Sequence, residues 1–594
     1  MDYLGLVCTS FAVIVTGIFV RVFLSYKDLS KELKIKHSKL KSDREKFLKQ
    51  IRDKEKLLKP SIDWTEIVLK SASELHEMAV NKTLSCLEIL TAFQIQCAEY
   101  LEMNFLAEFI ETADSIAEDF DNRHKELSHL PLYGVPVSLK ESLQVANLDA
   151  TCGLVKYCNN PKKMSCVIYQ TLVANGAIPF ITTSMARAGM SHDSSNPIFG
   201  EQHNPRYPGY TAGGSSGGEG IALSIDASPL GVGTDIGGSV RFPPCFNGIC
   251  GINPCRRRIS SMGVFAPGSI PRLEITLTVG PMARKVEDLV LFFQAVLSDK
   301  MFSLDPLLVP LPFQMNDYES EKPLRIAYLT SFRDNNLAQA VPSVQRAVND
   351  AVNLLTRAGH QLKEFNFPRP NYGFRLVLLS LLHDSGLSLA ELLAYEPIPA
   401  QKKLTMFLLN VPKIIRSKLV DIFYCKFGEP ALPLRDAVKG ISTAFHAAEL
   451  IKNIEDYRAE FLKAMEDFDL ILCPCFPVPI PAKNEDDTYN NISAIYAIMW
   501  NLLDLPAGVL CTSRVTEEDN RHAQIKAREL EALGDRFNAH LNKTQTRTGL
   551  PLSVQVVARP FQEAKLLRVM KFLESNSQFN RYEVPIRKDH HTVG

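Results

Sequence analysis

A glycine- and serine-rich stretch in the middle of the chain restricts its possible structures more than any other feature. Residues 211–220 read Thr-Ala-Gly-Gly-Ser-Ser-Gly-Gly-Glu-Gly, and residues 231–239 read Gly-Val-Gly-Thr-Asp-Ile-Gly-Gly-Ser. Glycine packs no side chain and loses the most backbone entropy on folding, so a buried core has no use for so much of it. The glycines therefore indicate a backbone that turns tightly, or that approaches a ligand closely and presents N–H groups to it.

Three residues in and near this stretch have the chemistry for acyl transfer. Ser239 is the predicted nucleophile, because a Gly-Gly-Ser turn exposes both its hydroxyl and successive N–H groups. Lys140 ends the apolar run Pro-Val-Ser-Leu-Lys and is the predicted base. Burial must then lower its pKa, since desolvation disfavours the ammonium form. Ser215 is predicted to pass the proton between Lys140 and Ser239.

The same turn offers donors for the negative charge that develops on the substrate oxygen. We predict that the N–H groups of Ile236, Gly237, Gly238 and Ser239 form an oxyanion hole. One such donor is typically worth ~10²–10³ in rate.

Three other interpretations fit the motif less well. A flexible Gly-Ser linker is disfavoured by the apolar residues at positions 230, 232, 236, 240 and 242. A phosphate-binding loop needs the pattern G-x-x-x-x-G-K-[ST], and no lysine follows these glycines. A Ser-His-Asp triad would use His192 and Asp193, but adjacent residues in one loop rarely act on each other in that way.

These residues belong to an ordered series of motifs that resembles the amidase-signature family of serine hydrolases. The Ser–Ser–Lys triad of that family maps onto Ser239, Ser215 and Lys140. The resemblance implies a mixed sheet sandwiched between helices, and amide hydrolysis without a cofactor or a metal. The motifs cover the chain from about residue 61 to about residue 575 and comprise residues 136–140, 195–200, 213–218, 233–242, 248–254, 280–284, 505–508 and 549–555.

Within the family, the chain most resembles the members that hydrolyse fatty acid amides at membranes. This resemblance implies N-acylethanolamines and primary fatty acid amides as substrates, and a homodimer. One departure is Gly189, in the loop before Ser191, where those members have a larger apolar residue. The Gly189 backbone is still expected to contact the substrate head, and the pocket is expected to be wider. An acyl channel or ordinary core would contain Ile495, Ile498, Met499 and Trp500.

Length and composition favour a large α/β enzyme. The chain has 594 residues, and β-like runs at 133–139, 177–182, 324–329 and 469–473 alternate with helical stretches. Alternation of this kind predicts a mainly parallel sheet between helices. Together with the mixed sheet that the resemblance implies, the expected fold is α/β with a large mixed, mainly parallel sheet. The formal net charge is zero, which gives no reason to expect nucleic acid as a partner. The thirteen cysteines include no C-x-x-C pair, so free thiols are expected rather than zinc.

The first 26 residues are predicted to anchor the chain in a membrane. The apolar run from Leu4 to Val20 spans ~26 Å as a helix, and its extension past Arg21 exceeds the ~30 Å of a bilayer core. A cleaved signal peptide has positive charges before such a run, whereas here they follow it. Residues 27–59 carry thirteen Lys or Arg against six Asp or Glu, so the positive-inside rule places them in the cytosol. We therefore expect a single-pass protein of an endomembrane, such as the endoplasmic reticulum, with its catalytic domain in the cytosol.

Residues 27–60 are expected to form a basic helical linker that is exposed near anionic lipid. Leu33, Leu40 and Phe47 recur every seven residues, which leaves a coiled coil as the alternative, although the repeat is short. Pro60 ends the helix, and the catalytic domain is predicted to extend over residues 61–594.

Residues 401–427 are predicted to form a second membrane element, an amphipathic cap on the catalytic domain. Six Lys or Arg interrupt a strongly apolar set there, and Pro412 splits the segment into two short helices. Neither helix can span a bilayer, but a basic amphipathic pair suits insertion into one leaflet. A pair of core or dimer helices is the alternative. The separate signal at the N-terminus and the resemblance to a membrane-binding cap favour the membrane.

The sequence thus predicts a membrane-bound serine hydrolase that cleaves fatty acid amides to free fatty acid and amine. An amidase of small amides, or an amidotransferase subunit on the same fold, is the alternative, and it would need neither the anchor nor the cap. A catalytically inactive membrane scaffold is disfavoured, because Lys140, Ser215 and Ser239 are all present.

Overall fold

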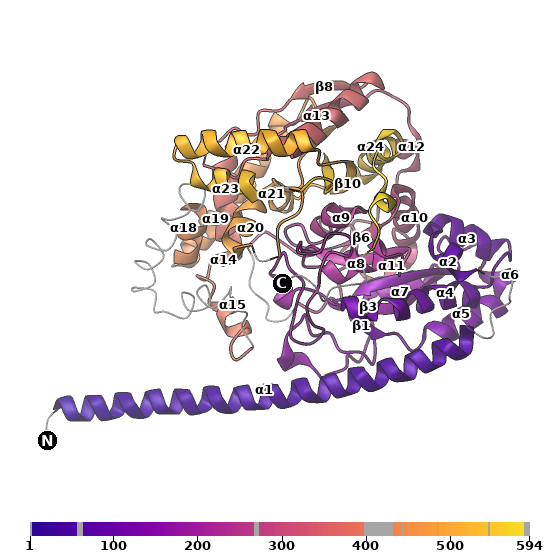
Figure 1. The fold of residues 1–594 in the computed structure, drawn as a ribbon, viewed down its shortest axis with the longest axis horizontal. Helices are drawn as coiled ribbons and strands as arrows, with labels where there is room; N and C mark the ends of the chain where they lie inside the picture. The colour runs from indigo at the N-terminus through magenta and orange to yellow at the C-terminus, as the bar shows by residue number, and fades with distance from the viewer. Residues whose placement is uncertain are drawn as a thin grey trace.

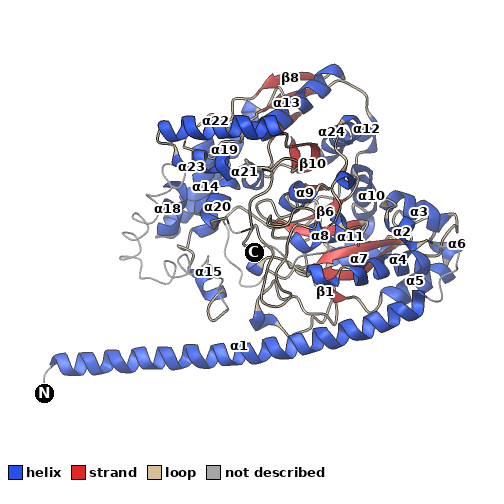
Figure 2. Cartoon of the chain, viewed as in Figure 1, coloured by secondary structure: helices blue, strands red, loops and turns tan. Residues whose placement is uncertain are grey.

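The computed structural model describes residues 3–55, 63–266, 273–334, 336–396, 432–441, 443–483, 485–544 and 547–586. Side chains are described from residue 28 onward within these ranges, apart from those of residues 432 and 434. Figure 1 shows the long helix α1 (Tyr3–Glu55) along one side of a body in which helices surround a central sheet. Figure 2 shows the same arrangement by type of element.

One sheet of eleven strands runs through the described part of the chain, in the order β1-β3-β2-β4-β6-β5-β10-β11-β9-β7-β8. Every residue of β2, β4 and β6 is buried, as expected for strands covered by other elements on both faces. The strands are β1 (Leu106–Phe109), β2 (Val135–Lys140), β3 (Ala177–Thr183), β4 (Leu230–Asp235), β5 (Cys250–Asn253), β6 (Thr278–Ala283), β7 (Arg325–Tyr328), β8 (Gln361–Glu364), β9 (Leu470–Cys473), β10 (Ala507–Arg514) and β11 (Pro551–Ala558).

The sheet is large and mixed, as predicted, but the expectation that it is mainly parallel is wrong. β2 pairs in parallel with β3 and β4, and β7 pairs in parallel with β8 and β9. The other neighbouring strands in the described sheet are antiparallel. β4 and β5 do run in the same direction, as a strand–helix–strand sequence predicts, but β6 is inserted between them and runs opposite to both. β11 is inserted between β9 and β10 in the same way, so alternation along the chain does not reveal which strands become neighbours.

The two halves of the sheet repeat one arrangement. The strands from β2 to β6 lie in the order 3-2-4-6-5, and those from β7 to β11 lie in the corresponding order 8-7-9-11-10. The halves meet where β5 and β10 pair antiparallel, which relates them by an approximate two-fold rotation. β1 extends the outer edge of the first half by pairing with β3.

Helices connect and cover these strands. α3, α4 and α22 each begin with a capping box, in which a Ser or Thr and an acidic residue three positions later satisfy each other's backbone N–H groups. The helices after α1 are α2 (Trp64–Val68), α3 (Ala72–Val80), α4 (Cys86–Glu99), α5 (Ala113–Asn122), α6 (His124–Leu127), α7 (Val167–Ala174), α8 (Gly217–Ser224), α9 (Phe242–Asn247), α10 (Val286–Val296), α11 (Asp299–Leu304), α12 (Met315–Glu319), α13 (Pro342–Arg357), α14 (Pro370–Leu382), α15 (Leu387–Leu392), α18 (Leu432–Lys439), α19 (Ala444–Ala464), α20 (Asp487–Ser493), α21 (Ile495–Leu503), α22 (Glu517–Ala532), α23 (Arg536–Thr544) and α24 (Glu563–Asn576).

The C-terminal part of α1 lies against the rest of the chain and is not the exposed helix that the sequence predicted. Leu40, Phe47 and Ile51 are each at most 8% exposed. Leu40 packs in an apolar cluster with Ala107 of β1, and the Phe47 ring stacks on that of Phe109. The apolar residues that recur every seven positions therefore dock α1 onto the edge of the sheet rather than onto a second helix of a coiled coil.

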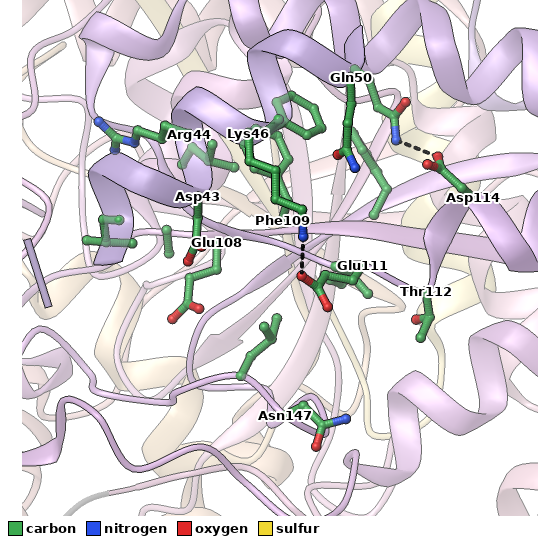
Figure 3. Close-up of a pocket in the computed structure, with 18 of the residues that line it drawn as sticks. Asp43, Arg44, Lys46, Gln50, Glu108, Phe109, Glu111, Thr112, Asp114 and Asn147 are labelled. Atoms are coloured by element: carbon green, nitrogen blue, oxygen red, sulfur yellow. Dashed lines mark hydrogen bonds and ion pairs between the residues drawn. The ribbon is translucent and has the colours of Figure 1, made fainter. Parts of the chain in front are cut away.

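Charged residues occupy the space between α1 and the edge strand β1. A pocket of about 440 Å³ lies there, and Figure 3 shows Lys46 of α1 reaching Glu111 across it. Their charged groups are 3.6 Å apart, and Gln94 donates a hydrogen bond to Asp114 Oδ1 at 2.9 Å nearby. None of the predicted catalytic residues lines this pocket, so we assign it to the docking of α1.

A fully buried lysine holds α1 to the domain. Lys36 is 0% exposed, and its ammonium donates to Glu108 and, at 2.8 Å, to Asp149 Oδ2. Both carboxylates are buried, and Asp149 also accepts the backbone N–H groups of Asn159 and Asn160. Loss of the lysine would leave buried negative charge without a partner, which is far more costly than loss of an exposed ion pair.

Replacement of Lys36 by alanine should lower the free energy of unfolding by ~3–5 kcal/mol, the usual cost of breaking a buried ion pair. Lys46→Ala is the matched control from the same helix, because its pair with Glu111 is exposed. Exposed pairs contribute only ~0–1 kcal/mol. Urea unfolding followed by circular dichroism measures the difference, and equal midpoints for the two variants would contradict a structural role of Lys36.

The membrane elements stay predictions. Among the residues that the structure describes, no helix is long and apolar enough to cross a membrane. The anchor predicted at residues 1–26 lies outside the described side chains, and the cap predicted at residues 401–427 lies outside the described residues.

Candidate active site

The ends of two neighbouring parallel strands meet at the predicted site. Lys140 is the last residue of β2, and β4 ends at Asp235, from which the chain turns into α9. Because β2 and β4 are parallel neighbours, their carboxyl ends lie at the same edge of the sheet. Ser215 reaches the same place from the loop that precedes α8. The fold thus brings together residues that are far apart in the sequence.

A continuous chain of hydrogen bonds links the three predicted catalytic residues. Lys140 Nζ donates to Ser215 Oγ at 2.7 Å and to the Thr234 carbonyl at 3.2 Å, and Ser215 Oγ donates to Ser239 Oγ at 3.0 Å. The exposed fraction rises along this chain from 0% at Lys140 to 3% at Ser215 and 9% at Ser239. The lysine end is therefore sealed from solvent, and Ser239 is the member nearest to an incoming substrate.

Burial brings the pKa of the Lys140 amine close to neutral pH. Burial lowers the pKa of Lys140 from 10.5 to about 8, against the raising effects of Cys152, Asp235, Glu219 and Glu141. The lysine bonds to a hydroxyl and a carbonyl rather than to a carboxylate, so no ion pair in direct contact restores the usual value. The lowered pKa agrees with the sequence prediction.

The turn after β4 places backbone N–H groups beside the Ser239 hydroxyl. Gly238 has a φ of +123°, which only glycine adopts readily. Asp235 shapes this turn, because its Oδ1 accepts the Gly238 N–H at 2.7 Å and its Oδ2 accepts the Val240 N–H at 3.0 Å. The Gly238 N–H is thus already engaged, whereas the other three predicted oxyanion donors find no acceptor within the described structure.

A buried arginine fixes the far end of the turn, and the sequence reasoning did not identify it. Arg241 is 0% exposed and donates to both carboxylate oxygens of Asp235, at 3.0 and 3.2 Å. It also donates to the side chains of Asn501 at 2.6 Å and Gln555 at 3.1 Å, which come from α21 and β11. Although burial opposes ionisation, Arg241 holds the pKa of Asp235 below its usual value. The opposite charges of Asp235 and Arg241, at the two ends of an otherwise uncharged turn, could have indicated this ion pair from the sequence. No motif indicated the side-chain amides of Asn501 and Gln555.

Gly189 lies beside the relay serine. A Cβ at this position would be 3.8 Å from Ser215 Oγ and 3.6 Å from Met185 Cε, which is ordinary contact. The φ of +69° nevertheless favours glycine there. A pocket of about 390 Å³ adjoins the same loop, and its lining includes Arg187 and Ser191 on either side of Gly189 in the sequence. Gly189 thus borders the predicted site, and its contact with a substrate head stays a prediction.

The two residues of the alternative Ser-His-Asp arrangement, His192 and Asp193, each contact other groups. Asp193 Oδ1 accepts hydrogen bonds from the N–H and the hydroxyl of Ser195, at 3.0 and 2.8 Å. The His192 ring lies against the ring of Phe242, with centroids 5.0 Å apart. Asp193 thus contributes to the structure of its own loop, and His192 packs that loop against α9.

The apolar residues of α21 face two different parts of the core. Ile498 lies against the catalytic turn, since a Cβ on Gly237 would come within 2.7 Å of Ile498 Cδ1. Trp500 instead packs against Phe367 and Phe461. The core interpretation therefore holds for Trp500, whereas Ile498 borders the site.

Comparison with known proteins agrees with this fold. A family model described as Amidase matches residues 88–567. The chain is 37% identical over 453 residues to fatty-acid amide hydrolase 1 of Sus scrofa, covering 75% of each chain. It is 31% identical over 558 residues to fatty acid amide hydrolase 1 of Caenorhabditis elegans, covering 92% of this chain and 95% of the relative. A solved structure of a fatty acid amide hydrolase resembles it in fold, with a TM-score of 0.73 at 23% identity over 94% of this chain and 96% of that one.

The chain belongs to the amidase family and is a hydrolase that acts on amide bonds. This confirms the family resemblance that the motifs indicated. The matched region begins inside α4 and ends inside α24, so it contains β1 to β11 and the three linked residues. α1 lies outside it.

Proposed function

We propose that this protein hydrolyses fatty acid amides, including N-acylethanolamines and primary fatty acid amides, to free fatty acid and amine. The observation that carries the proposal is the unbroken hydrogen-bond chain from Lys140 through Ser215 to Ser239. It supplies a base, a relay and a nucleophile in the order that amide hydrolysis requires. The lipid substrate is supported by two relatives that are named as fatty acid amide hydrolases.

Acylation begins when Ser239 Oγ attacks the carbonyl carbon of the amide. As the new C–O bond forms, the Ser239 proton passes to Ser215 Oγ and the Ser215 proton passes to the neutral amine of Lys140. Both hydroxyls can rotate, so the same contacts serve transfer in either direction. The substrate oxygen becomes an oxyanion that accepts hydrogen bonds from the N–H groups of Ile236, Gly237 and Ser239. The Lys140 ammonium then returns a proton through Ser215 to the leaving nitrogen, the C–N bond breaks, and the amine departs.

Deacylation uses the same groups with water as the nucleophile. Water attacks the ester carbonyl of the acylated Ser239 and gives a proton through Ser215 to Lys140. The ester C–O bond then breaks, the proton returns to Ser239 Oγ, and the fatty acid leaves. One base therefore serves both half-reactions, because each half-reaction takes up a proton and later releases it.

A membrane location fits this substrate, and we include it in the proposal. The predicted anchor at residues 1–26 and the predicted cap at residues 401–427 would hold the site at the bilayer, where lipid amides partition. In Figure 1, α15 and α18, which flank the cap segment in the sequence, lie on the side of the body toward which the N-terminal half of α1 extends. The cytosolic orientation, the endomembrane and the homodimer stay predictions.

In a panel of amides of increasing chain length, the purified protein should hydrolyse long-chain amides with the higher kcat/KM. A fluorophosphonate probe should label Ser239, and Ser239→Ala should abolish both labelling and turnover. Ser216→Ala is the matched control, because its buried hydroxyl has no hydrogen-bond partner within the described chain. A preference for acetamide over long-chain amides would favour an amidase of small substrates. Labelling of Ser239→Ala at the wild-type level would contradict the assignment of the nucleophile.

The kcat/KM should rise with pH as Lys140 loses its proton, because only the neutral amine can accept one. With a pKa of about 8, the rate should increase up to that pH and level off above it. A histidine base would already reach its plateau above ~6.5. Lys140→Ala should remove this dependence and slow probe labelling, whereas Ser215→Ala should be milder, since a water can replace a hydroxyl relay. If kcat/KM instead rose with a pKa near ~6.5 and this rise persisted in Lys140→Ala, Lys140 would be excluded as the base.

Deletion of residues 1–26 should leave a protein that still binds liposomes, because the predicted cap remains. Leu408→Glu and Ile415→Glu in the deleted protein should release it to the soluble fraction, since charge is costly in an apolar interface. Sedimentation with liposomes measures both steps. Complete release by the deletion alone would show that residues 401–427 do not bind the membrane.

A further inference from the structure

A buried carboxylate lies next to the strand that carries Lys140. Glu219 belongs to the first turn of α8 and is 0% exposed. Its Oε2 accepts a hydrogen bond from Ser138 Oγ at 2.6 Å, and its Oε1 accepts one from Thr183 Oγ1 at 2.7 Å. Each oxygen of the carboxylate is thus bound to a hydroxyl, one from β2 and one from β3.

Both hydroxyls belong to the immediate surroundings of Lys140. Ser138 is two residues before Lys140 on β2, so the two side chains lie on the same face of the sheet. Thr183 is the residue opposite Lys140 in the β2–β3 register. Glu219 therefore fastens the first turn of α8 to the strand of Lys140 and to its neighbour. Because Ser215 lies just before that turn, this fastening fixes the distance from Lys140 Nζ to Ser215 Oγ.

The glycine motif makes room for this carboxylate. Gly231 of β4 is the partner of Ser138 in the β2–β4 register, and a Cβ on Gly231 would lie only 2.1 Å from Glu219 Oε2. A side chain at Gly231 would displace the carboxylate from its two hydroxyls. Gly231 is therefore required by a buried side chain, and not by a turn or a ligand contact as predicted for these glycines.

Glu219 also acts on Lys140 through its charge. Burial raises the pKa of Glu219 to about 7, while its two hydroxyl donors and the positive charge of Lys140 act in the opposite direction. The other groups that face Lys140 are Cys152, Asp235 and Glu141. Asp235 is neutralised by its arginine, and Glu141 accepts hydrogen bonds from Thr151 and from a backbone N–H. Removal of the negative charge on Glu219 would make the ammonium form of Lys140 less favourable.

We propose that Glu219 is a positioning residue of the hydrolytic site, which holds Lys140 and Ser215 at hydrogen-bond distance and sets, by its negative charge, the pH range in which Lys140 is neutral. Glu219 acts through these residues and does not touch the substrate. The inference rests on the proposed role of Lys140 as the base.

The first test is Glu219→Gln, which keeps the shape of the side chain but removes its charge and one acceptor. We expect kcat to fall by ~10²-fold, because a displacement of about 1 Å in a catalytic group has that effect. KM should change little, since no substrate contact is lost. The rising limb of kcat/KM should shift to lower pH, because Lys140 loses a neighbour that favours its charged form. Fluorophosphonate labelling of Ser239 should slow in parallel.

Two further variants separate the hydrogen bond from the charge. Thr183→Val keeps the volume of the side chain but removes the hydroxyl that binds Glu219. We therefore expect kcat to fall, and the pH dependence of kcat/KM to shift less than in Glu219→Gln. Thr183→Ser restores the hydroxyl and should recover most of the activity. Asp288→Asn is the matched control, because Asp288 is also 0% exposed and accepts hydrogen bonds from the N–H and the hydroxyl of Ser73 in a part of the fold away from Lys140. It should leave kcat and the pH limb of the folded enzyme at wild-type values.

The outcomes distinguish this inference from the proposed function. The proposed function itself would be contradicted if the wild-type enzyme did not hydrolyse amides, or if its kcat/KM did not rise with pH near the pKa of Lys140. If the wild type is active and its kcat/KM rises with pH as expected for Lys140, but Glu219→Gln keeps the wild-type kcat, only the role of Glu219 is contradicted. The role of Glu219 would also be contradicted if Glu219→Gln lowered kcat without shifting the pH dependence of kcat/KM, because general structural damage has that result. An equal fall of kcat in the control variant Asp288→Asn would likewise contradict a specific role of Glu219.

Discussion

The site depends on the cost of placing a positive charge on a lysine that has no contact with solvent. A pKa lowered from 10.5 to about 8 means that burial disfavours the ammonium by ~3 kcal/mol relative to an exposed lysine. The lowered pKa gives Lys140 a substantial neutral fraction near neutral pH, as the proposed role of base requires, and still allows the ammonium to form. Burial raises the pKa values of Glu141 and Glu219 to about 7 each. The groups around Lys140 therefore change charge within a narrow pH range, and small changes in their packing should alter which of them holds the proton.

The two halves of the sheet divide the work of this site. Lys140, Ser215 and Ser239 all come from the first half, between β2 and the turn after β4. The second half supplies Asn501 and Gln555, whose side chains bind the arginine that holds the catalytic turn. The turn is therefore shaped only when both halves are folded and packed together. The family match over residues 88–567 contains the strands of both halves.

The sequence revealed the chemistry of the site better than its support. Lys140, Ser215 and Ser239 were predicted from the Gly-Gly-Ser turn, the apolar lead-in to the lysine and the family resemblance, and the structure brings the three side chains together. Strand order was not predictable, because β6 and β11 each pair between two strands that precede them in the sequence. The docking of α1 was missed for a related reason. A lysine such as Lys36 looks solvated until the two carboxylates that receive it are known, and these lie far away in the sequence.

α1 lies outside the family match, yet contacts connect it to the site. Lys36 binds Glu108 of β1, and β1 pairs with β3 in a register that places Leu106 opposite Thr183. Thr183 in turn binds Glu219 at the start of the helix that follows the relay serine. α1 is also unbroken from Tyr3 to Glu55. A continuous docked helix transmits orientation, which a flexible linker cannot do. If residues 1–26 are held in a membrane, as proposed, the same helix sets the angle at which the sheet edge and its active site face the bilayer.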